Sequence, residues 1–311
     1  TSLGVKGSEV RILSLRPFKM LENRHSKKLF TFLTVLKYLV NKYKYLSHLS
    51  LLTRKVNQNI ELEDEEYYEV KSFLDKLPDN FLSYVDIGAG NGVNGSSVLK
   101  LAQNDLWRGL HIEYGDISLL SNIYREFKNI QIAKVRVNPK NIVNLFDGYE
   151  ISKEFGYLNL DIDSFDYEVL ESILLAGYRP AVASIEINEV IPPPIFYYAK
   201  YSDHSDEYMV DYFFGCSLTA ANNLMKKFNY NLSHIYGNNA FFLHRDHFDE
   251  PRMQEMVAYN NGYIQMKNRE LKYSYNQRVD FLIKEDPYQI CNFLDNLWKD
   301  KKTDYELRIS N

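Results

Sequence analysis

The sequence contains little cysteine. Its only two cysteines, Cys216 and Cys291, lie far apart and do not have the spacing of a metal site. This excludes a disulfide framework and gives no indication of a zinc centre. We therefore expect a reducing compartment, the cytoplasm.

Long hydrophobic runs are also missing. The longest, from Leu29 to Val40, has 12 residues and includes Lys37, so it is too short and too polar to cross a bilayer. No secretory signal precedes it, and we expect no membrane span. Internal repeats and low-complexity segments are absent as well. A chain of 311 residues with 45% hydrophobic residues can bury a sizeable core.

Charge is distributed unevenly along the chain. Residues 1–60 contain 12 Lys/Arg and 2 Asp/Glu, a balance of +10, whereas the whole chain has a net charge of −4. These basic residues alternate with Leu, Phe and Val at helical spacing, which is typical of the solvated face of a packed helix. We therefore expect no nucleic-acid partner.

The spacing of apolar residues predicts three regions. Residues 1–80 form a helical N-terminal extension, a lid or dimerisation element through which the chain could form a homo-oligomer. Residues 81–248 alternate strand and helix and form the central α/β domain. Residues 249–311 form a polar, helical C-terminal extension, whose last helix begins at Asp286-Pro287.

The middle region predicts a doubly wound α/β fold with a mostly parallel sheet. Strands are expected near Phe81–Ile87, Gly109–Tyr114, Ile130–Val137, Tyr157–Ile162 and Ala181–Ile187. Helices are expected at Ser96–Gln103, Ile117–Phe127, Asn141–Phe146, Phe165–Leu175 and Ser217–Phe228. Two further strands, Asn231–Tyr236 and Ala240–His244, flank a Gly/Asn turn and predict an antiparallel hairpin.

A glycine cluster follows the first predicted strand. Gly88, Gly90 and Gly92 lie between an apolar strand end and the start of a helix, and only glycine lets a backbone turn so tightly against a ligand. Gly90-x-Gly92-x-x-Gly95 satisfies the dinucleotide fingerprint, and Glu113 is an acid of the kind that binds ribose hydroxyls. On the glycines alone, a nicotinamide dinucleotide and S-adenosylmethionine both fit.

Asp86 distinguishes these two cofactors. A carboxylate two residues before the first glycine would repel an anionic pyrophosphate, whereas S-adenosylmethionine carries an ammonium and a sulfonium and no phosphate. The run from Asp86 to Gly92, Asp-x-Gly-x-Gly-x-Gly, resembles the first motif of class I S-adenosylmethionine-dependent methyltransferases. These enzymes have a seven-stranded sheet that ends in an antiparallel hairpin, as predicted here.

Acids and amides follow four of the five predicted parallel strands, where ligands of open α/β sheets bind. Further motifs, among them Trp107-x-Gly109, Asp161-Ile-Asp163 and Glu186-Ile-Asn188, resemble in their order a bacterial methyltransferase group that modifies surface polysaccharides and natural products. The resemblance covers about residues 80–245. That group usually has Asp-Gly-x-Asp-Tyr where this chain has Asp163-Ser-Phe-Asp-Tyr. Without that glycine, the sequence does not determine the backbone conformation at this position.

The resemblance implies a cofactor site and an acceptor site. The cofactor-binding residues would be Asp86, Gly88, Gly90, Gly92, Asn94, Glu113, Asn138 and Asp161, with the ribose on Glu113 and the methionyl end near Asp86 and Asp161. The acceptor site would include the loop from Pro192 to Gly215, which is rich in tyrosine and contains His204.

Two ways of activating an acceptor hydroxyl remain open. The oxygen ligands of Asp161, Asp163, Glu186 and Asn188 suit Mg²⁺, which would lower the pKa of the hydroxyl. Without a metal, Asp163 or His204 would be the general base, and Glu186 and Asn188 would hold the acceptor.

The sequence thus predicts a methyltransferase that acts on a hydroxyl of a sugar, glycan precursor or similar polar metabolite, for example in polysaccharide biosynthesis. Two alternatives remain, an NAD(P)-dependent oxidoreductase and a methyltransferase-like binding subunit without turnover. The acceptor, the position methylated and the choice between oxygen and nitrogen stay open.

Overall fold

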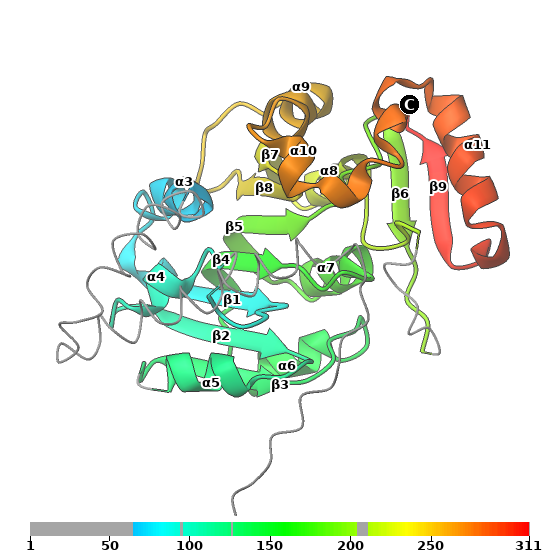
Figure 1. The fold of residues 1–311 in the computed structure, drawn as a ribbon. Helices are drawn as coiled ribbons and strands as arrows, with labels where there is room; N and C mark the ends of the chain where they lie inside the picture. The colour runs from blue at the N-terminus through cyan, green and yellow to red at the C-terminus, as the bar shows by residue number, and fades with distance from the viewer. Residues whose placement is uncertain (1–64, 94–95, 126, 204–210, 311) are drawn as a thin grey trace, which may run out of the picture. The chain divides into compact units, whose positions relative to one another are not determined.

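The computed structural model describes residues 65–93, 96–125, 127–203 and 211–310. Its central feature is a seven-stranded sheet with the order β3-β2-β1-β4-β5-β8-β7 (Figure 1). The strands are β1 (Ser83–Ile87), β2 (Arg108–Glu113), β3 (Ile130–Lys134), β4 (Glu154–Leu160), β5 (Arg179–Glu186), β7 (Tyr230–Tyr236) and β8 (Asn239–His244).

Strands β1 to β5 are parallel, and β8 lies antiparallel between β5 and β7. The carboxyl ends of β1, β2, β4 and β5 therefore meet at one edge of the sheet (Figure 1). This order confirms the predicted class I methyltransferase fold, and it confirms the resemblance at the level of the fold.

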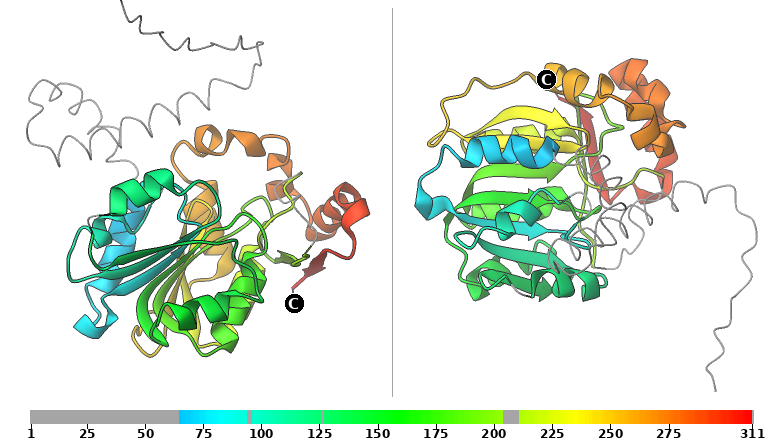
Figure 2. Two further views of the ribbon diagram at one scale, coloured as in Figure 1. Left: turned by 90° about the horizontal axis from the view of Figure 1, so that it is seen from below. Right: turned by 60° about the vertical axis from the view of Figure 1, so that its left-hand side comes forward.

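Helices cover both faces of the sheet (Figure 2). They are α3 (Glu65–Leu74), α4 (Leu99–Ala102), α5 (Ser118–Tyr124), α6 (Ile142–Gly148), α7 (Asp166–Leu175) and α8 (Leu218–Lys227). Contacts of α7 with both α6 and α8 place these three on one face. Because side chains alternate along a strand, Val85 and Ile87 of β1 enter the core beneath them, while Tyr84 and Asp86 face the other side.

The C-terminal region contains short helices and one strand. The helices are α9 (Glu255–Tyr259), α10 (Arg269–Lys272) and α11 (Pro287–Leu297), with a π turn at Asn260–Ile264 and 3₁₀ turns at Ser274–Asn276, Asp280–Lys284 and Lys299–Lys301. The expected start of the last helix is confirmed, because Asp286 caps α11 by accepting a hydrogen bond from the Tyr288 amide at 2.9 Å. Among the described residues, no helix has the length and apolar character needed to cross a membrane.

A second, two-stranded sheet is the main departure from the sequence prediction. Strand β6 (Ile195–Ala199) pairs antiparallel with β9 (Tyr305–Ile309), although we expected a loop in the first segment and helix in the second. Together with α11 they enclose a separate hydrophobic core that contains Trp298, 2% exposed. The three prolines before β6 concealed a run of β-branched and aromatic residues, Ile-Phe-Tyr-Tyr, which favours a strand.

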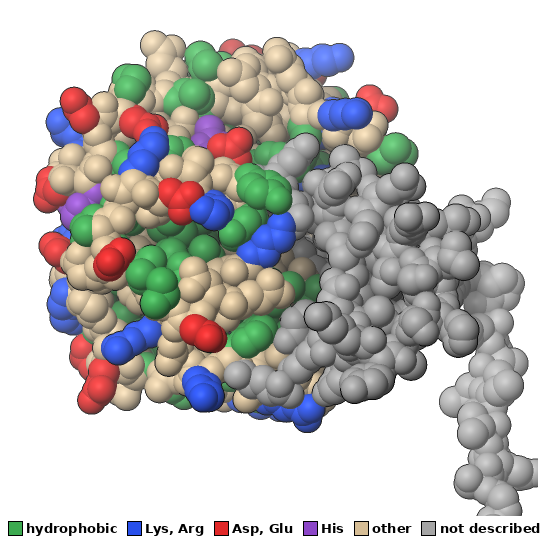
Figure 3. All heavy atoms as spheres, turned by 90° about the vertical axis from the view of Figure 1, so that its left-hand side faces the viewer, with side chains coloured by type: hydrophobic (Ala, Val, Ile, Leu, Met, Phe, Trp, Pro, Cys, Tyr) green, Lys and Arg blue, Asp and Glu red, His purple; other side chains and the backbone are tan. Residues whose placement is uncertain are grey.

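The predicted N-terminal extension lies mostly outside the described residues. Its last helix, α3, contacts the main sheet region through an edge-to-face ring pair between Phe73 and Phe248, with centroids 5.9 Å apart. On the face beside the amino ends of the strands, the described surface shows basic and acidic side chains intermixed (Figure 3).

Candidate functional site

The glycine turn, residues 88–92, joins β1 to the helix that follows it. Gly88, Gly90 and Gly92 have φ values of +85°, +53° and +73°, a region that L side chains rarely adopt. A Cβ on Gly88 would lie 1.6 Å from the carbonyl oxygen of Asp161. The turn therefore packs directly on the backbone at the end of β4, and only glycine fits there.

The tip of the turn borders open space. A Cβ on Gly90 would meet no atom within 4 Å, so this part of the backbone is accessible to a ligand. Beside it, the half-buried carboxylate of Glu113 accepts hydrogen bonds from the amides of Gly90 at 2.7 Å and Gly115 at 2.6 Å. The structure thus brings together the glycines and the acid at the end of β2 that the sequence predicts to hold a cofactor.

Asp86 lies inside the sheet. It is 3% exposed, and its two carboxylate oxygens bond His111 Nδ1 at 3.0 Å and Asn159 Nδ2 at 2.9 Å. His111 Nε2 in turn lies 2.9 Å from the hydroxyl of Tyr84. A neutral imidazole can donate to Asp86 and accept from Tyr84, so this network of side chains ties β1 to β2 and β4.

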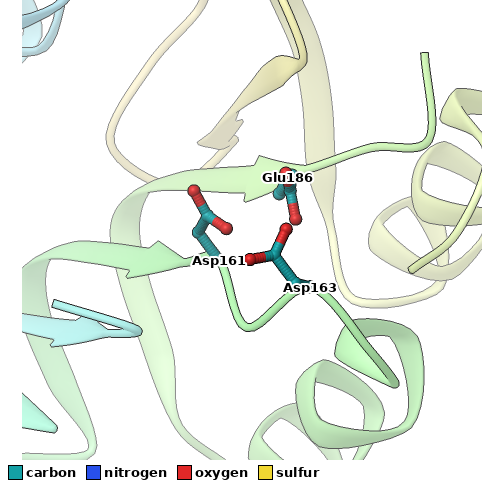
Figure 4. A group of neighbouring side chains, drawn as sticks. All are labelled: Asp161, Asp163 and Glu186. Carbon is teal, nitrogen blue, oxygen red and sulfur yellow. The ribbon is translucent and has the colours of Figure 1, made fainter. Parts of the chain in front are cut away.

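Three acids meet at the ends of β4 and β5. Asp161, Asp163 and Glu186 each offer a carboxylate oxygen, and these atoms lie within 4.8 Å of one another (Figure 4). We call these three residues the carboxylate cluster. Their convergence follows from the parallel sheet, which places the ends of β4 and β5 side by side.

Glu186 is the buried member of the carboxylate cluster, 5% exposed. Burial, followed by the negative charges of Asp161 and Asp163, raises its pKa well above the usual value. Its Oε1 accepts a hydrogen bond from Asn238 Nδ2 at 2.8 Å, and its Oε2 has no partner. A buried oxygen without a partner is unfavourable, which indicates a position where a ligand group or a cation would be stabilised.

Asp163 combines an exposed side chain with an unusual backbone. Its φ is +56°, a conformation that Asp tolerates better than most residues. Desolvation by the surrounding protein, then the charge of Glu113, raises its pKa. Ser164 replaces the glycine of the resembling group and lacks a positive φ. The left-handed residue is Asp163 itself, so the loop does not require glycine at position 164.

Asp166 fixes this loop. Its side chain is fully buried and accepts hydrogen bonds from the amides of Ile162 at 2.9 Å and Ser164 at 3.1 Å. Burial raises the pKa of Asp166 to about 6. The acid thus holds the segment that carries Asp163 in position.

The remaining predicted site residues are placed as follows. Asn188 is fully buried, and its amide nitrogen donates to the carbonyls of Tyr212 at 2.8 Å and Phe214 at 3.1 Å. Asn138 accepts from the amides of Lys140 and Asn141 and so shapes the loop after β3. Asn94 and His204 lie outside the described residues.

Asn238 is a site residue that the sequence analysis did not identify. It belongs to the β7–β8 turn, which we recognised only as a hairpin turn, yet its amide bonds Glu186. The pairing of β8 beside β5 brings them together, with Glu186 opposite Asn239. The only indication in the sequence was an amide side chain in the hairpin turn. It could be linked to Glu186 only if the order of the strands, with β8 beside β5, were known.

Neither a family model nor a curated protein sequence matches this chain. Similar solved structures include CalS11, described as a TDP-rhamnose 3′-O-methyltransferase of calicheamicin biosynthesis. It is 14% identical, with a TM-score of 0.40, and the alignment covers 74% of this chain and 96% of that one.

Two further similar structures are described as methyltransferases. CalO1 of calicheamicin biosynthesis is 13% identical with a TM-score of 0.34, and the alignment covers 66% of this chain but only 60% of CalO1. A SAM-dependent methyltransferase from Aquifex aeolicus is 12% identical with a TM-score of 0.31, and the alignment covers 60% of this chain and 95% of that one. At identities this low, what these proteins act on does not transfer to this chain, so its activity must be inferred from its own residues.

Proposed function

We propose that this chain is an S-adenosylmethionine-dependent methyltransferase that acts on a hydroxyl of a sugar or similar polar metabolite. The observation that carries the proposal is the position of the glycine turn. Its open tip at Gly90 borders Glu113, and the turn packs on Asp161, a member of the carboxylate cluster. A cofactor on the turn would therefore lie beside three acids.

The charge of this edge favours a cationic cofactor. The carboxylate cluster brings three acids to the ends of β4 and β5, beside Glu113 at the end of β2. The ionised acids of the cluster would repel the pyrophosphate of a nicotinamide dinucleotide and attract the ammonium and sulfonium of S-adenosylmethionine, whereas Glu113 suits the ribose of either cofactor. The antiparallel β8 also argues against the oxidoreductase alternative, since a dinucleotide-binding sheet would end in a parallel strand.

We propose that Gly88, Gly90 and Gly92 hold the methionyl and adenosyl parts of the cofactor, and that Glu113 binds its ribose. When bound, S-adenosylmethionine supplies an electrophilic methyl group. The task of the protein is then to remove the proton of the acceptor hydroxyl. Asp163 suits this role because it is exposed and has a raised pKa.

The carboxylate cluster also fits a divalent cation. Three carboxylates within 4.8 Å, one of them with an unpartnered oxygen, form the hard-oxygen set that Mg²⁺ or Mn²⁺ prefers. A cation held by Asp161, Asp163 and Glu186 would offset their mutual repulsion and lower the pKa of a nearby hydroxyl. It is the alternative to Asp163 acting as a free base.

A thermal-shift experiment with three ligands tests the cofactor. We expect S-adenosylmethionine and S-adenosylhomocysteine to raise the melting temperature and NAD to leave it unchanged. A ligand at 100 times its dissociation constant stabilises by about 2.7 kcal/mol. Stabilisation by NAD and not by the other two ligands would contradict the proposal and support the alternative of an NAD(P)-dependent oxidoreductase. Binding of S-adenosylhomocysteine without methyl transfer to any hydroxyl acceptor would favour the inert subunit.

A further inference from the structure

A turn from the C-terminal region, residues 273–276, lies near the end of β5, where it contacts Glu189 directly and Glu186 through Asn238. On one side, the hydroxyl of Tyr273 bonds Asn238, accepting from its backbone amide at 3.1 Å and donating to Oδ1 at 3.2 Å. Asn238 then bonds Glu186 of the carboxylate cluster at 2.8 Å. The 273–276 turn is therefore one hydrogen-bonded residue away from the proposed reacting groups.

On the other side, the same turn holds Glu189. Oε1 of this acid accepts hydrogen bonds from Asn276 Nδ2 at 2.7 Å and from the hydroxyl of Tyr275 at 3.2 Å. Glu189 is 1% exposed and Asn276 is fully buried, whereas Tyr275 is 53% exposed. The turn thus presents a buried acid and amide behind an exposed tyrosine.

Several buried oxygen atoms near the end of β5 have no hydrogen-bond partner. Oε2 of Glu189, Oδ1 of Asn276 and Oδ1 of Asn188 are buried without a hydrogen-bond partner, as is Oε2 of Glu186. Native proteins rarely leave such oxygens unpaired. The amide oxygens of Asn188 and Asn276 can only accept, and the carboxyl groups of Glu186 and Glu189 accept when ionised and donate when protonated, so a compound with several hydroxyls, which can do both, suits them.

This group of oxygens lies next to the carboxylate cluster. The negative charge of Asp163 contributes to the raised pKa of Glu189, after burial as the main cause. Likewise, Glu189 and, more weakly, Glu186 act on Tyr275, whose pKa is raised mainly by burial of its hydroxyl. Glu186 belongs to both groups and so joins them.

We propose that Glu189, Tyr275 and Asn276 form the acceptor-recognition site, and that the acceptor is a neutral compound with several hydroxyls, such as a sugar. This inference rests on the proposed methyltransferase function. The tyrosine hydroxyl occupies Glu189 Oε1 as an acceptor hydroxyl would. An acceptor reaches the buried carboxylate by displacing the hydroxyl of Tyr275, and the exposed part of this ring, which meets Tyr273 edge to face, can stack on the sugar.

Two variants distinguish binding of the acceptor by these residues from a purely structural role, in which their hydrogen bonds only hold the 273–276 turn in place. Glu189→Gln replaces an acceptor oxygen with a donor, so we expect acceptor binding to weaken roughly tenfold or more. Tyr275→Phe removes the hydroxyl that competes for Glu189 and keeps the ring, so we expect unchanged or tighter binding. If the two hydrogen bonds only hold the turn in place, both variants weaken binding in parallel.

The probes are methyl glycosides of common hexoses, their deoxy analogues and glucosamine, titrated by NMR into full-length protein saturated with S-adenosylhomocysteine. Glu171→Gln, a change on α7, is the matched control and should leave every dissociation constant unchanged. Thermal unfolding and S-adenosylhomocysteine affinity check that each variant folds.

Each outcome decides something. Weaker binding of a neutral glycoside to Glu189→Gln, together with unchanged or tighter binding to Tyr275→Phe, supports the inference. Parallel weakening, an unaffected Glu189→Gln, or binding of glucosamine alone overturns it, as does failure of the wild type to bind any glycoside while it binds S-adenosylhomocysteine. Failure to bind S-adenosylhomocysteine is a separate result, because it contradicts the proposed function.

Discussion

Glu113 Oε2 accepts a hydrogen bond from the amide of Gly90 at 2.7 Å, which joins the end of β2 to the tip of the glycine turn. This contact sets the position of the carboxylate that we propose for the cofactor ribose. It also means that the same side chain orders the turn and is available to bind the ligand.

The first prediction concerns this acid. Glu113→Ala should weaken S-adenosylhomocysteine binding by about 1.5–3 kcal/mol for each hydrogen bond that the carboxylate makes to the ligand. Isothermal calorimetry measures the change. Asp116→Ala, a nearby exposed acid that caps the amide of Ser118, is the matched control. Equal affinities for the wild type and Glu113→Ala would remove Glu113 from the site.

Gly88 and Gly90 should respond differently to alanine. At Gly88 the new Cβ would lie 1.6 Å from the Asp161 carbonyl oxygen, so the backbone must move and we expect loss of several kcal/mol of stability or of the fold. At Gly90 the space is open, and only the positive φ opposes the change, by about 1–2 kcal/mol. Chemical denaturation of both variants checks this order. Similar losses in the two would contradict the described turn.

Asp86 should act on stability more than on ligand binding. Asp86→Ala leaves the buried donor of His111 without a partner, which costs about 1–3 kcal/mol, and removes the acceptor of the half-buried Asn159. Asp86→Asn keeps one acceptor oxygen and should therefore lose less stability than Asp86→Ala. Urea unfolding gives the stabilities and calorimetry the S-adenosylhomocysteine affinity. A stable Asp86→Ala variant that no longer binds the ligand would show instead that Asp86 borders the cofactor.

Asp166 should make stability depend on pH. Burial raises its pKa to about 6 in the folded protein from an ordinary value of 3.8, so the folded state binds the proton more tightly. The contribution of this group is fully present below pH 4 and is lost as the pH rises to about 6, a change of about 3 kcal/mol. Asp166→Asn should flatten that part of the unfolding profile, measured in EDTA. Superimposable wild-type and variant slopes between pH 4 and 6 would exclude the raised pKa.

Divalent cations should stabilise the protein through the carboxylate cluster. After treatment with EDTA, added Mg²⁺ or Mn²⁺ should raise the melting temperature of the wild type, and Glu186→Gln should abolish the shift. Glu171→Gln serves as a control acid away from the cluster. Full methyl transfer after exhaustive chelation, with no shift on adding metal, would leave Asp163 as the free base.

The fold could be predicted because its signals are local. Alternating strand and helix patterns gave all seven strands of the main sheet, and the Gly237-Asn238 turn indicated the antiparallel hairpin. The two-stranded sheet could not be predicted in the same way. The pairing of β6 with β9 joins segments more than 100 residues apart, and neither is bounded by a turn that indicates its partner.

The site could be predicted only in part. The convergence of Asp161, Asp163 and Glu186 follows from parallel strands, whose carboxyl ends share one edge. The partners of Asp86 depend on register, which places it opposite His111 and Asn159 and which local patterns do not determine. The contact of residues 273–276 with the segment after β5 joins parts of the chain that are still further apart in the sequence, so local patterns could not predict it.

The pairing of β6 with β9 also bears on how the protein is made. All seven strands of the main sheet are present once residue 244 has left the ribosome, whereas β6 has only its bridge to Cys216 until its partner strand β9, residues 305–309, emerges. Non-local pairs form slowly, so a nascent chain can complete the glycine turn and the carboxylate cluster while the two-stranded sheet is still incomplete. During synthesis, the residues of the proposed cofactor site are thus complete before Tyr275 and Asn276 of the proposed acceptor site have emerged.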